Sequence, residues 1–481
     1  MKENQNYPKN DRREIFGWML YDWANSAFYT TVVAVLIGPY LIALAEAAAC
    51  RGVAESLLDN HPCQNAVLFN FLFFEVTVKG FPAFCIALSV VSMVVFLPLL
   101  GAIADYTHLK KRLMAIFSYG GVIGSSLLFF ATGDSYLLGG ILLIVSNMCF
   151  AAANVFYNAF LIDITTEDRR DRVSSYGYGA GYLGGVVMLI LNLLLINNAE
   201  SLGITKGLAV RISILSASLW WGAFAVISFY LLKNRGAVKE VPEDKKIVTI
   251  GFYELWQTLK ELKRLRYTMA FLIAYLFYND GIQTVILQSS AFLSNELFTA
   301  EERAASDDQS FLIGIFLVAQ ISALVGALVF ERVARFIGAK RTIILSLVIW
   351  CAIVVYAYAF LETRFQAWFM GAFIGLVLGS AQALSRSLYS QMIPVGRESS
   401  FFGIYEISEK GTSWMGQLLF AIIVGATGSF RQAILALIAF FVIGLVILIF
   451  TNTQRAIHEA GNLTPEEAAG LEKRHLSNEA G

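Results

Sequence analysis

Histidine, cysteine and charged residues are all scarce in this sequence. Of its 481 residues, 4 are His, 5 are Cys and 15% are charged. The four histidines fall in polar segments, which excludes a histidine proton relay inside a membrane, and no cluster has metal-ligand spacing. A phosphate-binding loop and a nucleophile–base pair are missing too. The sequence therefore supports neither an ATP-driven pump nor an enzyme, and it implies no metal or cofactor.

Net charge and targeting signals are also missing. The formal net charge is zero, which argues against a nucleic-acid partner. Residues 1–13 are polar and basic, and the apolar run after them is far longer than the ~7–15 residues of a signal-peptide core. We therefore expect no cleavable signal peptide.

Apolar residues, in contrast, make up 57% of the chain, and 37 residues are Phe. A spanning helix needs roughly 20 mostly apolar residues. Twelve such runs predict an all-α integral membrane protein with two six-helix repeats. They lie at residues 15–45, 82–104, 112–132, 136–161, 173–196, 209–232, 267–292, 311–333, 341–361, 366–390, 400–426 and 430–451.

The distribution of basic residues predicts the orientation. With a cytoplasmic N-terminus, 27 of the 36 Lys and Arg residues lie on the cytoplasmic side and 7 on the other. The two that remain, Arg386 and Lys410, lie within helices, and we expect Arg386 to extend its charge to the nearby cytoplasmic surface. An even number of helices then places both termini in the cytoplasm, and we expect a plasma-membrane protein.

The chain divides into five segments. A cytoplasmic tail (1–14) and the first six helices (15–232) precede a cytoplasmic middle loop (233–266). The second six helices (267–451) and a C-terminal tail (452–481) follow it. In the middle loop, apolar residues from Phe252 to Leu262 repeat at helical spacing among basic residues, which predicts an amphipathic helix on the membrane surface.

The loop between the first two helices contains two cysteines, Cys50 and Cys63. They can form a disulfide if the compartment is oxidising, and two free thiols are the alternative. Residues 67–74 are apolar but too few to span, so we expect them to extend the second helix or to lie at the interface.

The two halves resemble each other in sequence. Sliding the chain by 253 residues places Thr31 on Thr284 and Asn25 on Tyr278, and Asp280 aligns with Ala27, a turn deeper than Asp22. Polar groups thus recur ~20 Å from the basic start of each helix, in the middle part of a bilayer. Parallel repeats with a midplane site are a transporter architecture.

Polar residues inside the first and seventh helices are the main candidates for the site. A carboxylate at a helix centre costs ~2.5–3.5 kcal/mol on insertion scales and usually faces a watery cavity or a protein interior. Asp280 and Asn25 are expected to form the cavity floor, and Asp22 to guard its cytoplasmic mouth. The alternatives are a carboxylate near the headgroups for Asp22 and a packing hydrogen bond for Asn25.

Further polar residues lie in the fourth, seventh and eleventh helices. For Asn154, Asn158, Asn279 and Gln283, pocket lining and helix packing both stay open. Glu406 and Lys410 have the spacing and order of an intrahelical ion pair, either structural or functional. We take Asp22, Asn25, Asn154, Asn158, Asn279, Asp280, Gln283 and Lys410 as substrate-binding candidates, and Asp280, Glu406 and Glu409 as proton-coupling candidates.

The loop after the second helix carries a family motif. Gly101 and Asp105, followed by basic residues up to Arg112, resemble the signature of the major facilitator superfamily. A second copy with Glu331 and Arg341 lies after the eighth helix, where Ala327 holds the expected glycine position. In that family the acid latches neighbouring helices in one state of the transport cycle. The resemblance therefore implies a conformational latch of Asp105, Arg112, Glu331 and Arg341.

Residues 21–28, 278–284 and 401–405 resemble the vacuole-effluxer-like family of major facilitators. That family includes the autophagy-related amino-acid effluxer of fungal vacuoles. The resemblance covers nearly the whole chain and implies a transporter that rocks two halves about a central cavity.

We therefore expect a monomeric secondary transporter in the lipid bilayer, with amino acids as the small-molecule substrate and a coupling proton. Drugs or other small metabolites are the alternative cargo. A sensor or scaffold without transport is the alternative of another class, although the tails and the middle loop offer little soluble chain for it.

Overall fold

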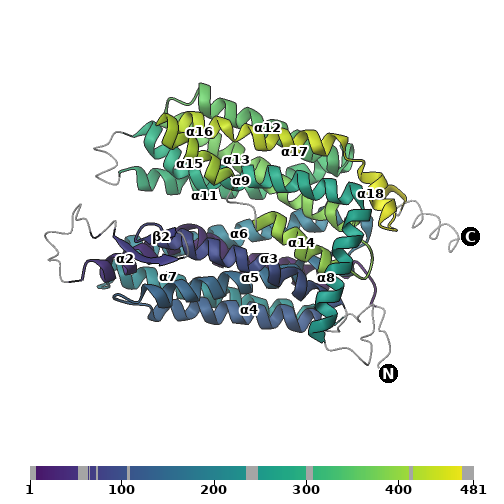
Figure 1. The fold of residues 1–481 in the computed structure, drawn as a ribbon, viewed down its shortest axis with the longest axis horizontal. Helices are drawn as coiled ribbons and strands as arrows, with labels where there is room; N and C mark the ends of the chain where they lie inside the picture. Colours follow the sequence, from purple (N-terminus) through teal and green to yellow (C-terminus); the bar gives the residue numbers. More distant parts are fainter. Residues whose placement is uncertain are drawn as a thin grey trace, which may run out of the picture.

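The computed structural model describes residues 7–51, 63, 66–71, 74–105, 109–234, 247–298, 307–410 and 415–467. Most helices run side by side along the long axis of the molecule, and both termini lie at one end (Figure 1). Within the described residues, eleven helical stretches are long and apolar enough to cross a membrane. The predicted all-α, multi-pass membrane architecture is confirmed.

The N-terminal half comprises α1 (Arg12–Ala27), η1 (Phe28–Leu36), α2 (Ile37–Ala49), β1 (Val67–Phe71), β2 (Phe74–Thr77), α3 (Phe81–Asp105), α4 (Lys110–Leu127), η4 (Leu128–Phe130), α5 (Tyr136–Ile164), η5 (Glu167–Arg169), α6 (Arg170–Asn197) and α7 (Lys206–Leu231). The connecting helix α8 (Ile247–Arg264) follows. The C-terminal half comprises α9 (Arg266–Leu297), α11 (Asp307–Ile337), α12 (Ala339–Ala359), α13 (Arg364–Gln391), α14 (Glu398–Lys410), α15 (Met415–Thr427), α16 (Phe430–Ala436), α17 (Ile438–Phe450) and α18 (Thr453–Glu459).

The first span is one helical stretch of 38 residues with an irregular centre. Its middle, η1, is a π-helix of nine residues that begins directly after α1. π-Helical segments are rare and frequently occur at functional sites. Here the π-helix follows the polar residues Asn25 and Ser26.

In the region of the predicted helix over residues 400–426, the structure describes two helices of 13 residues each, α14 and α15. Residues 411–414 between them lie outside the described part of the chain, so one continuous helix stays a prediction.

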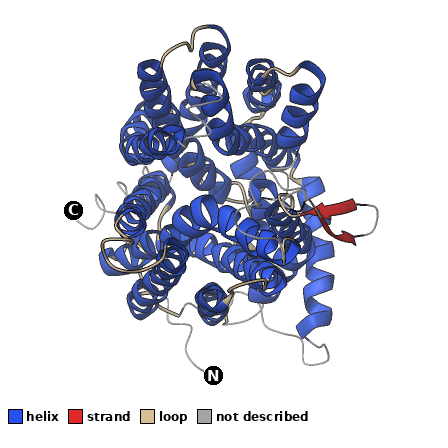
Figure 2. Ribbon diagram, turned by 90° about the vertical axis from the view of Figure 1, so that its left-hand side faces the viewer, coloured by secondary structure: helices blue, strands red, loops and turns tan. Residues whose placement is uncertain are grey.

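Residues 67–71 and 74 do not extend the second helix, so that alternative is wrong, while a place at the interface stays a prediction. They belong to the antiparallel strands β1 and β2, drawn in red at the side of the bundle in Figure 2. Aromatic and β-branched residues favour strands, and this segment is rich in Phe and Val. The rings of Phe69 and Phe71 pack against Phe84 of α3, with centroids 5.6 and 5.1 Å away, which fixes β1 to the bundle.

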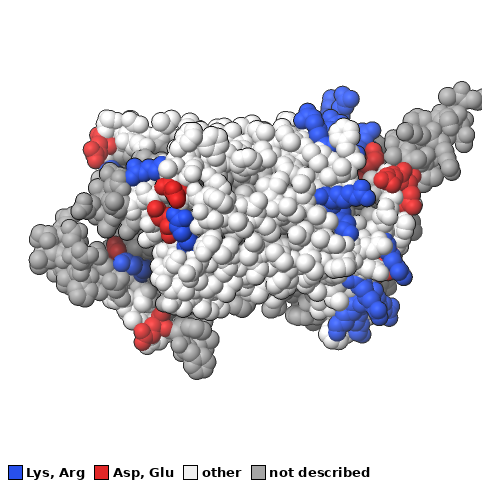
Figure 3. Space-filling view, turned by 90° about the horizontal axis from the view of Figure 1, so that it is seen from above, with Lys and Arg blue, Asp and Glu red and all other residues white. Residues whose placement is uncertain are grey.

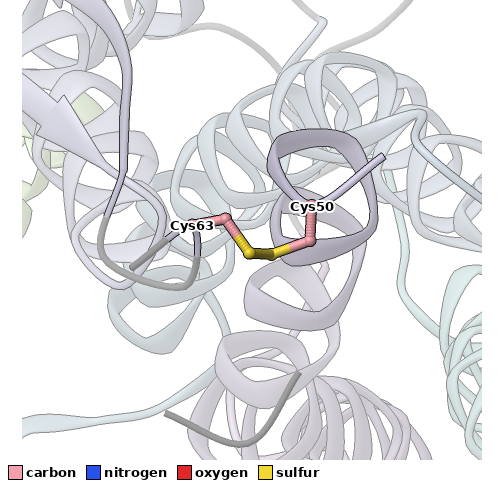
Figure 4. Close-up of a disulfide and its surroundings, with 2 residues drawn as sticks. All are labelled: Cys50 and Cys63. Carbon is pink, nitrogen blue, oxygen red and sulfur yellow. A yellow bond between two sulfur atoms is a disulfide. The ribbon is translucent and has the colours of Figure 1, made fainter. Parts of the chain in front are cut away.

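The sequence left the state of Cys50 and Cys63 open, and the structure shows a disulfide between them (Figure 4). The bond links the end of the first span to the loop before β1, across 13 positions of sequence. Its place is the end of the molecule opposite the termini.

Removing this disulfide is expected to lower the free energy of unfolding by about 2–3 kcal/mol, because a loop of this length gains conformational entropy in the unfolded chain. Thermal unfolding of the purified protein with and without reductant measures the loss, and Cys50→Ser/Cys63→Ser should reproduce it. Cys351→Ser, which removes a free cysteine, serves as the matched control. Equal melting of oxidised and reduced protein would contradict this expectation.

The middle loop contains the helix α8, and its place on the membrane surface stays a prediction. It runs across the ends of the spanning helices at the end that holds the termini (Figure 1) and packs on α3. Thr258 and Leu262 are buried, while the indole of Trp256 is 59% exposed with the Lys260 ammonium 5.5 Å from its ring. Basic side chains gather at this same end (Figure 3).

Glycine stripes on α6 and α13 let helices approach to backbone contact. A Cβ on Gly375 or Gly379 of α13 would collide with the carbonyl oxygens of Ala319 and Ala323 on α11. On α6, a Cβ at Gly184 would collide with the backbone of Trp23 on α1. The glycines of α6 therefore bring α1 and α6 together where the polar residues of α1 lie.

The two halves meet at the end of the molecule that holds the termini. Helix α14 packs on α3 and α5, while α6 packs on α11 and α13. In the described part of the chain, hydrogen bonds join the two halves. They run from the last ten residues of α13 and from Ser399, Ser400 and Glu406 of α14 to the facing helices of the N-terminal half. The structure thus shows a state that is closed at this end.

Candidate functional site

Arg386 of α13 is the centre of the contact between the halves. Its side chain is 3% exposed, which corrects the prediction that it extends to the membrane surface. Nη1 donates to Asn158 Oδ1 (3.3 Å) and lies 3.5 Å from Asp22 Oδ2. Nε and Nη2 donate to the hydroxyl and carbonyl oxygens of Ser174, both at 2.9 Å. The planar guanidinium of arginine directs several N–H donors at fixed angles and can bind these three partners at once. A lysine ammonium could not reproduce this arrangement.

Three aromatic rings surround the guanidinium of Arg386. Its Cζ lies 4.2 Å from the ring centroid of Tyr178, 4.8 Å from that of Trp18 and 5.5 Å from that of Tyr157. Cation–π contacts of this kind are worth ~2 kcal/mol or more when desolvated. They compensate part of the cost of burying this charge away from water.

Asp22 is held by its neighbours in the N-terminal half. The Tyr157 hydroxyl donates to Asp22 Oδ2 at 2.6 Å. The Trp18 indole stacks on the Tyr157 ring and donates to the Tyr157 carbonyl oxygen at 2.9 Å. Asp22 is therefore a buried member of the central contact (8% exposed).

A glycine makes room for this charge pair. A Cβ on Gly177 of α6 would lie 2.7 Å from the Trp18 ring, 2.8 Å from Asp22 Oδ2 and 3.2 Å from Arg386 Nη2. Contacts under 3.0 Å are sterically forbidden for a real side chain, so no other residue fits here without displacing the pair. The glycine stripe of α6 shapes the site as well as the packing.

A second polar link joins α5 to α14. Asn158 Nδ2 donates to Glu406 Oε1 at 2.7 Å, so Asn158 contacts both Arg386 and Glu406 of the opposite half. Asn25, in contrast, pairs with Asn154 (3.0 Å) inside the N-terminal half. The side chain of Lys410 lies outside the described residues, so the expected Glu406–Lys410 pair stays a prediction.

Asp105 of α3 binds the beginning of α14. Its carboxylate accepts the backbone N–H groups of Ser399 (2.9 Å) and Ser400 (2.8 Å) and the Ser400 hydroxyl (2.6 Å). Because α14 begins at Glu398, these amides belong to its first turn and have no partner within the helix. The residue expected as a latch thus caps a helix of the other half.

In the basic cluster that follows Asp105, the residue that forms an ion pair is Lys110 rather than Arg112. The Lys110 ammonium lies 2.9 Å from Asp163 Oδ2, while Arg112 is exposed. In the second copy, Glu331 accepts both guanidinium hydrogen bonds of Arg335 on its own helix (2.8 and 2.7 Å), and Arg341 is exposed. The two copies therefore differ: the first joins the halves, and the described contacts of Glu331 are local.

The candidates of α9 contact the end of α14 and the beginning of α15. Asn279 Nδ2 donates to the carbonyl oxygen of Glu409 near the end of α14, and Asp280 Oδ2 accepts the N–H of Gly416 near the beginning of α15, both at 2.7 Å. Both residues are 0% exposed, and Gln283 is half-buried on the same helix. Asp280 and Asn25 thus have different partners in this structure, and the shared cavity floor stays a prediction.

Sequence reasoning missed three residues of the central contact: Arg386, Tyr157 and Ser174. One signal was present, because Arg386 and Lys410 are the two cations inside predicted helices. Because Arg386 lies near a helix end, the sequence favoured a side chain that extends to the cytoplasmic surface. The pattern around Tyr157 and Ser174 contains no signal of this kind, since their partners lie far away in sequence.

Comparisons with known proteins agree with this architecture. A sequence profile described as "Vacuole effluxer Atg22 like" matches residues 10–461. The chain is 33% identical to "Uncharacterized MFS-type transporter YxiO" of Bacillus subtilis over 90% of this chain and 93% of that protein. It is 25% identical to "Autophagy-related protein 22" of Kluyveromyces lactis, over 95% and 97% of the two chains.

Solved structures show the same fold. The fucose transporter FucP in the outward conformation superposes with a TM-score of 0.64 at 12% identity, covering 92% of this chain and 99% of that one. The proton:xylose symporter XylE gives 0.63 at 12% identity, covering 95% and 98%. With the family profile spanning nearly the whole chain, the protein belongs to the vacuole effluxer Atg22-like family and is a membrane transporter with the major facilitator fold, not an enzyme.

Proposed function

We propose that this protein exports small zwitterionic solutes, amino acids above all, by alternating access. The observation that carries the proposal is the buried charge contact between Asp22 of one half and Arg386 of the other. The family supports transport, and its description as "Vacuole effluxer Atg22 like" agrees with efflux.

The charge contact suits a zwitterion because its two charges belong to opposite halves. Opening the closed end must separate α13 from α1 and α6, which leaves a guanidinium and a carboxylate buried without each other. Removing one partner of a buried ion pair destabilises a protein by about 3–5 kcal/mol, because the other charge stays buried without compensation. A substrate carboxylate on Arg386 and a substrate ammonium on Asp22 would compensate both charges and lower this barrier.

The rings of Trp18, Tyr157 and Tyr178 add an apolar wall around the guanidinium. They exclude water and strengthen a charge-assisted hydrogen bond to a carboxylate. The arrangement therefore favours an amino acid over a neutral sugar, whose hydroxyl groups would leave both charges uncompensated.

The proposed location is the plasma membrane, with both termini in the cytoplasm. The bias of 27 to 7 basic residues supports this orientation. The end where the halves meet is then cytoplasmic, and the disulfide is on the oxidising outer side. A closed cytoplasmic end corresponds to an outward-facing transporter.

Flux of labelled amino acids across proteoliposomes tests the proposal. We expect saturable transport that unlabelled amino acids inhibit. Amino-acid methyl esters and N-acetyl amino acids, which each lack one charge, should inhibit at least ~10-fold more weakly. Arg13→Gln, an exposed change in the first turn of α1, is expected to leave flux unchanged. If no amino acid crosses under any ion gradient, the proposal fails.

A further inference from the structure

Three buried oxygens on α9 lack hydrogen-bond donors. Among the described residues, Asn279 Oδ1, Asp280 Oδ1 and Thr284 Oγ1 have no partner, although all three residues are 0% exposed. Buried polar atoms of native proteins are satisfied in more than 90% of cases. Three exceptions within six residues of one helix require a common explanation.

The three side chains lie beside the end of α14 and the beginning of α15. Asn279 donates to Glu409 near the end of α14, and Asp280 accepts from Gly416 near the beginning of α15. A Cβ on Gly416 would collide with Thr284 Oγ1 and would lie 3.3 Å from Asp280 Oδ2. The oxygens of Thr284 and Asp280 therefore border the beginning of α15 together, and glycine lets the backbone approach them.

The orientation of the Asn279 amide follows from its contact. Because Nδ2 donates to the Glu409 carbonyl oxygen, Oδ1 is the atom left over. Oδ1 of Asn279 and Oδ1 of Asp280 can only accept, unless Asp280 is protonated. A positively charged occupant would satisfy both and offset the cost of the carboxylate inside the membrane.

We propose that Asn279, Asp280 and Thr284 form a binding site for Na⁺ beside the end of α14 and the beginning of α15. A carboxylate, an amide oxygen and a hydroxyl are hard oxygen ligands of the kind that such cations take. Among the described residues, no Lys or Arg forms an ion pair with Asp280, so its single negative charge matches a monovalent cation. A divalent ion would leave an uncompensated positive charge.

The site deepens the proposed function, since it names the coupling ion of the same transporter, and it replaces the proton expected at Asp280. Na⁺ bound to α9 would stabilise its contacts with both α14 and α15. Of these two helices, α14 also contacts the N-terminal half through Asp105 and Asn158. Occupancy of the site is thus linked to the contact between the halves.

The test measures binding, without transport. Purified protein in detergent is melted in NaCl, KCl or choline chloride at equal ionic strength and fixed pH, and ²²Na⁺ binding is titrated. We expect a saturable rise in melting temperature with Na⁺ alone. Asp280→Asn should weaken Na⁺ binding at least ~100-fold, and Thr284→Val about 10-fold.

Thr31→Val is the matched control, because Thr31 is the repeat equivalent of Thr284 and its Oγ1 is also buried without a partner among the described residues. It should retain Na⁺ binding. Equal melting in all three salts, or unchanged Na⁺ affinity in both α9 variants, overturns the site. If a fall in pH replaces Na⁺ as the stabilising condition, the occupant is a proton and the proposal is wrong. Na⁺ binding without amino-acid flux would refute the proposed substrate and leave this site standing.

Discussion

Replacing Arg386 by alanine is expected to reduce transport by at least ~100-fold and to destabilise the protein by about 3–5 kcal/mol. The change leaves Asp22 buried without its cation, and truncating one partner of a buried pair has costs of this size. It also removes the donors to Asn158 and Ser174. Flux in proteoliposomes and thermal unfolding measure the two effects.

Arg386→Lys keeps the charge but cannot form the three-nitrogen contact, so we expect it to retain stability better than alanine while transport still falls about 10-fold. The double variant Asp22→Asn/Arg386→Gln separates structure from function. Removing both charges should restore most of the lost stability, because no unpaired charge remains. Transport by the double variant at the normal rate would show that the pair is structural and would contradict the zwitterion proposal.

Asp105→Ala is expected to open the closed end. The variant loses two backbone N–H bonds and one hydroxyl bond to the first turn of α14. Hydrogen bonds to a charged group contribute about 1.5–3 kcal/mol each, and the backbone amides regain part of this from water once the halves separate. A net loss of about 3 kcal/mol corresponds to a ~100-fold shift in population between the two states.

Hydrogen–deuterium exchange of the amides of Ser399 and Ser400 measures this shift directly, because these amides donate to Asp105. Their exchange should accelerate by up to ~100-fold in the variant. Glu331→Ala is the matched control in the second copy of the motif, where the described bonds stay within one helix. Similar acceleration by both variants would mean that the two copies latch the halves equally.

Much of the fold was predictable because the bilayer imposes a simple rule. Each spanning helix needs a run of apolar residues, and eleven of the twelve predicted runs are long helices in the structure. In the eleventh run the structure describes α14 and α15, and residues 411–414 between them lie outside the described part of the chain. The strands at residues 67–71 and 74–77 were not predictable, because an apolar segment shorter than a span can be a helix or a strand.

The sequence predicted site residues where a polar side chain interrupts an apolar run, because such a residue is costly inside a bilayer. Asp22, Asn158, Asp280 and Glu406 are polar in apolar surroundings, and all four lie at contacts between helices. Their partners were not predictable, since Asp22 and Arg386 are 364 positions apart. A position near a helix end looks the same whether it faces lipid headgroups or another helix.

The sequence by itself determined that the chain crosses a membrane many times, and it identified Asp105, Asp22 and Asp280 as acids in unusual places. These properties depend on composition and local spacing. Only the tertiary structure decided that Arg386 is buried against Asp22, that Asp280 contacts the beginning of α15, and that Cys50 bonds Cys63. Each of these depends on which helix faces which, and packing between distant segments leaves no periodic pattern in the sequence.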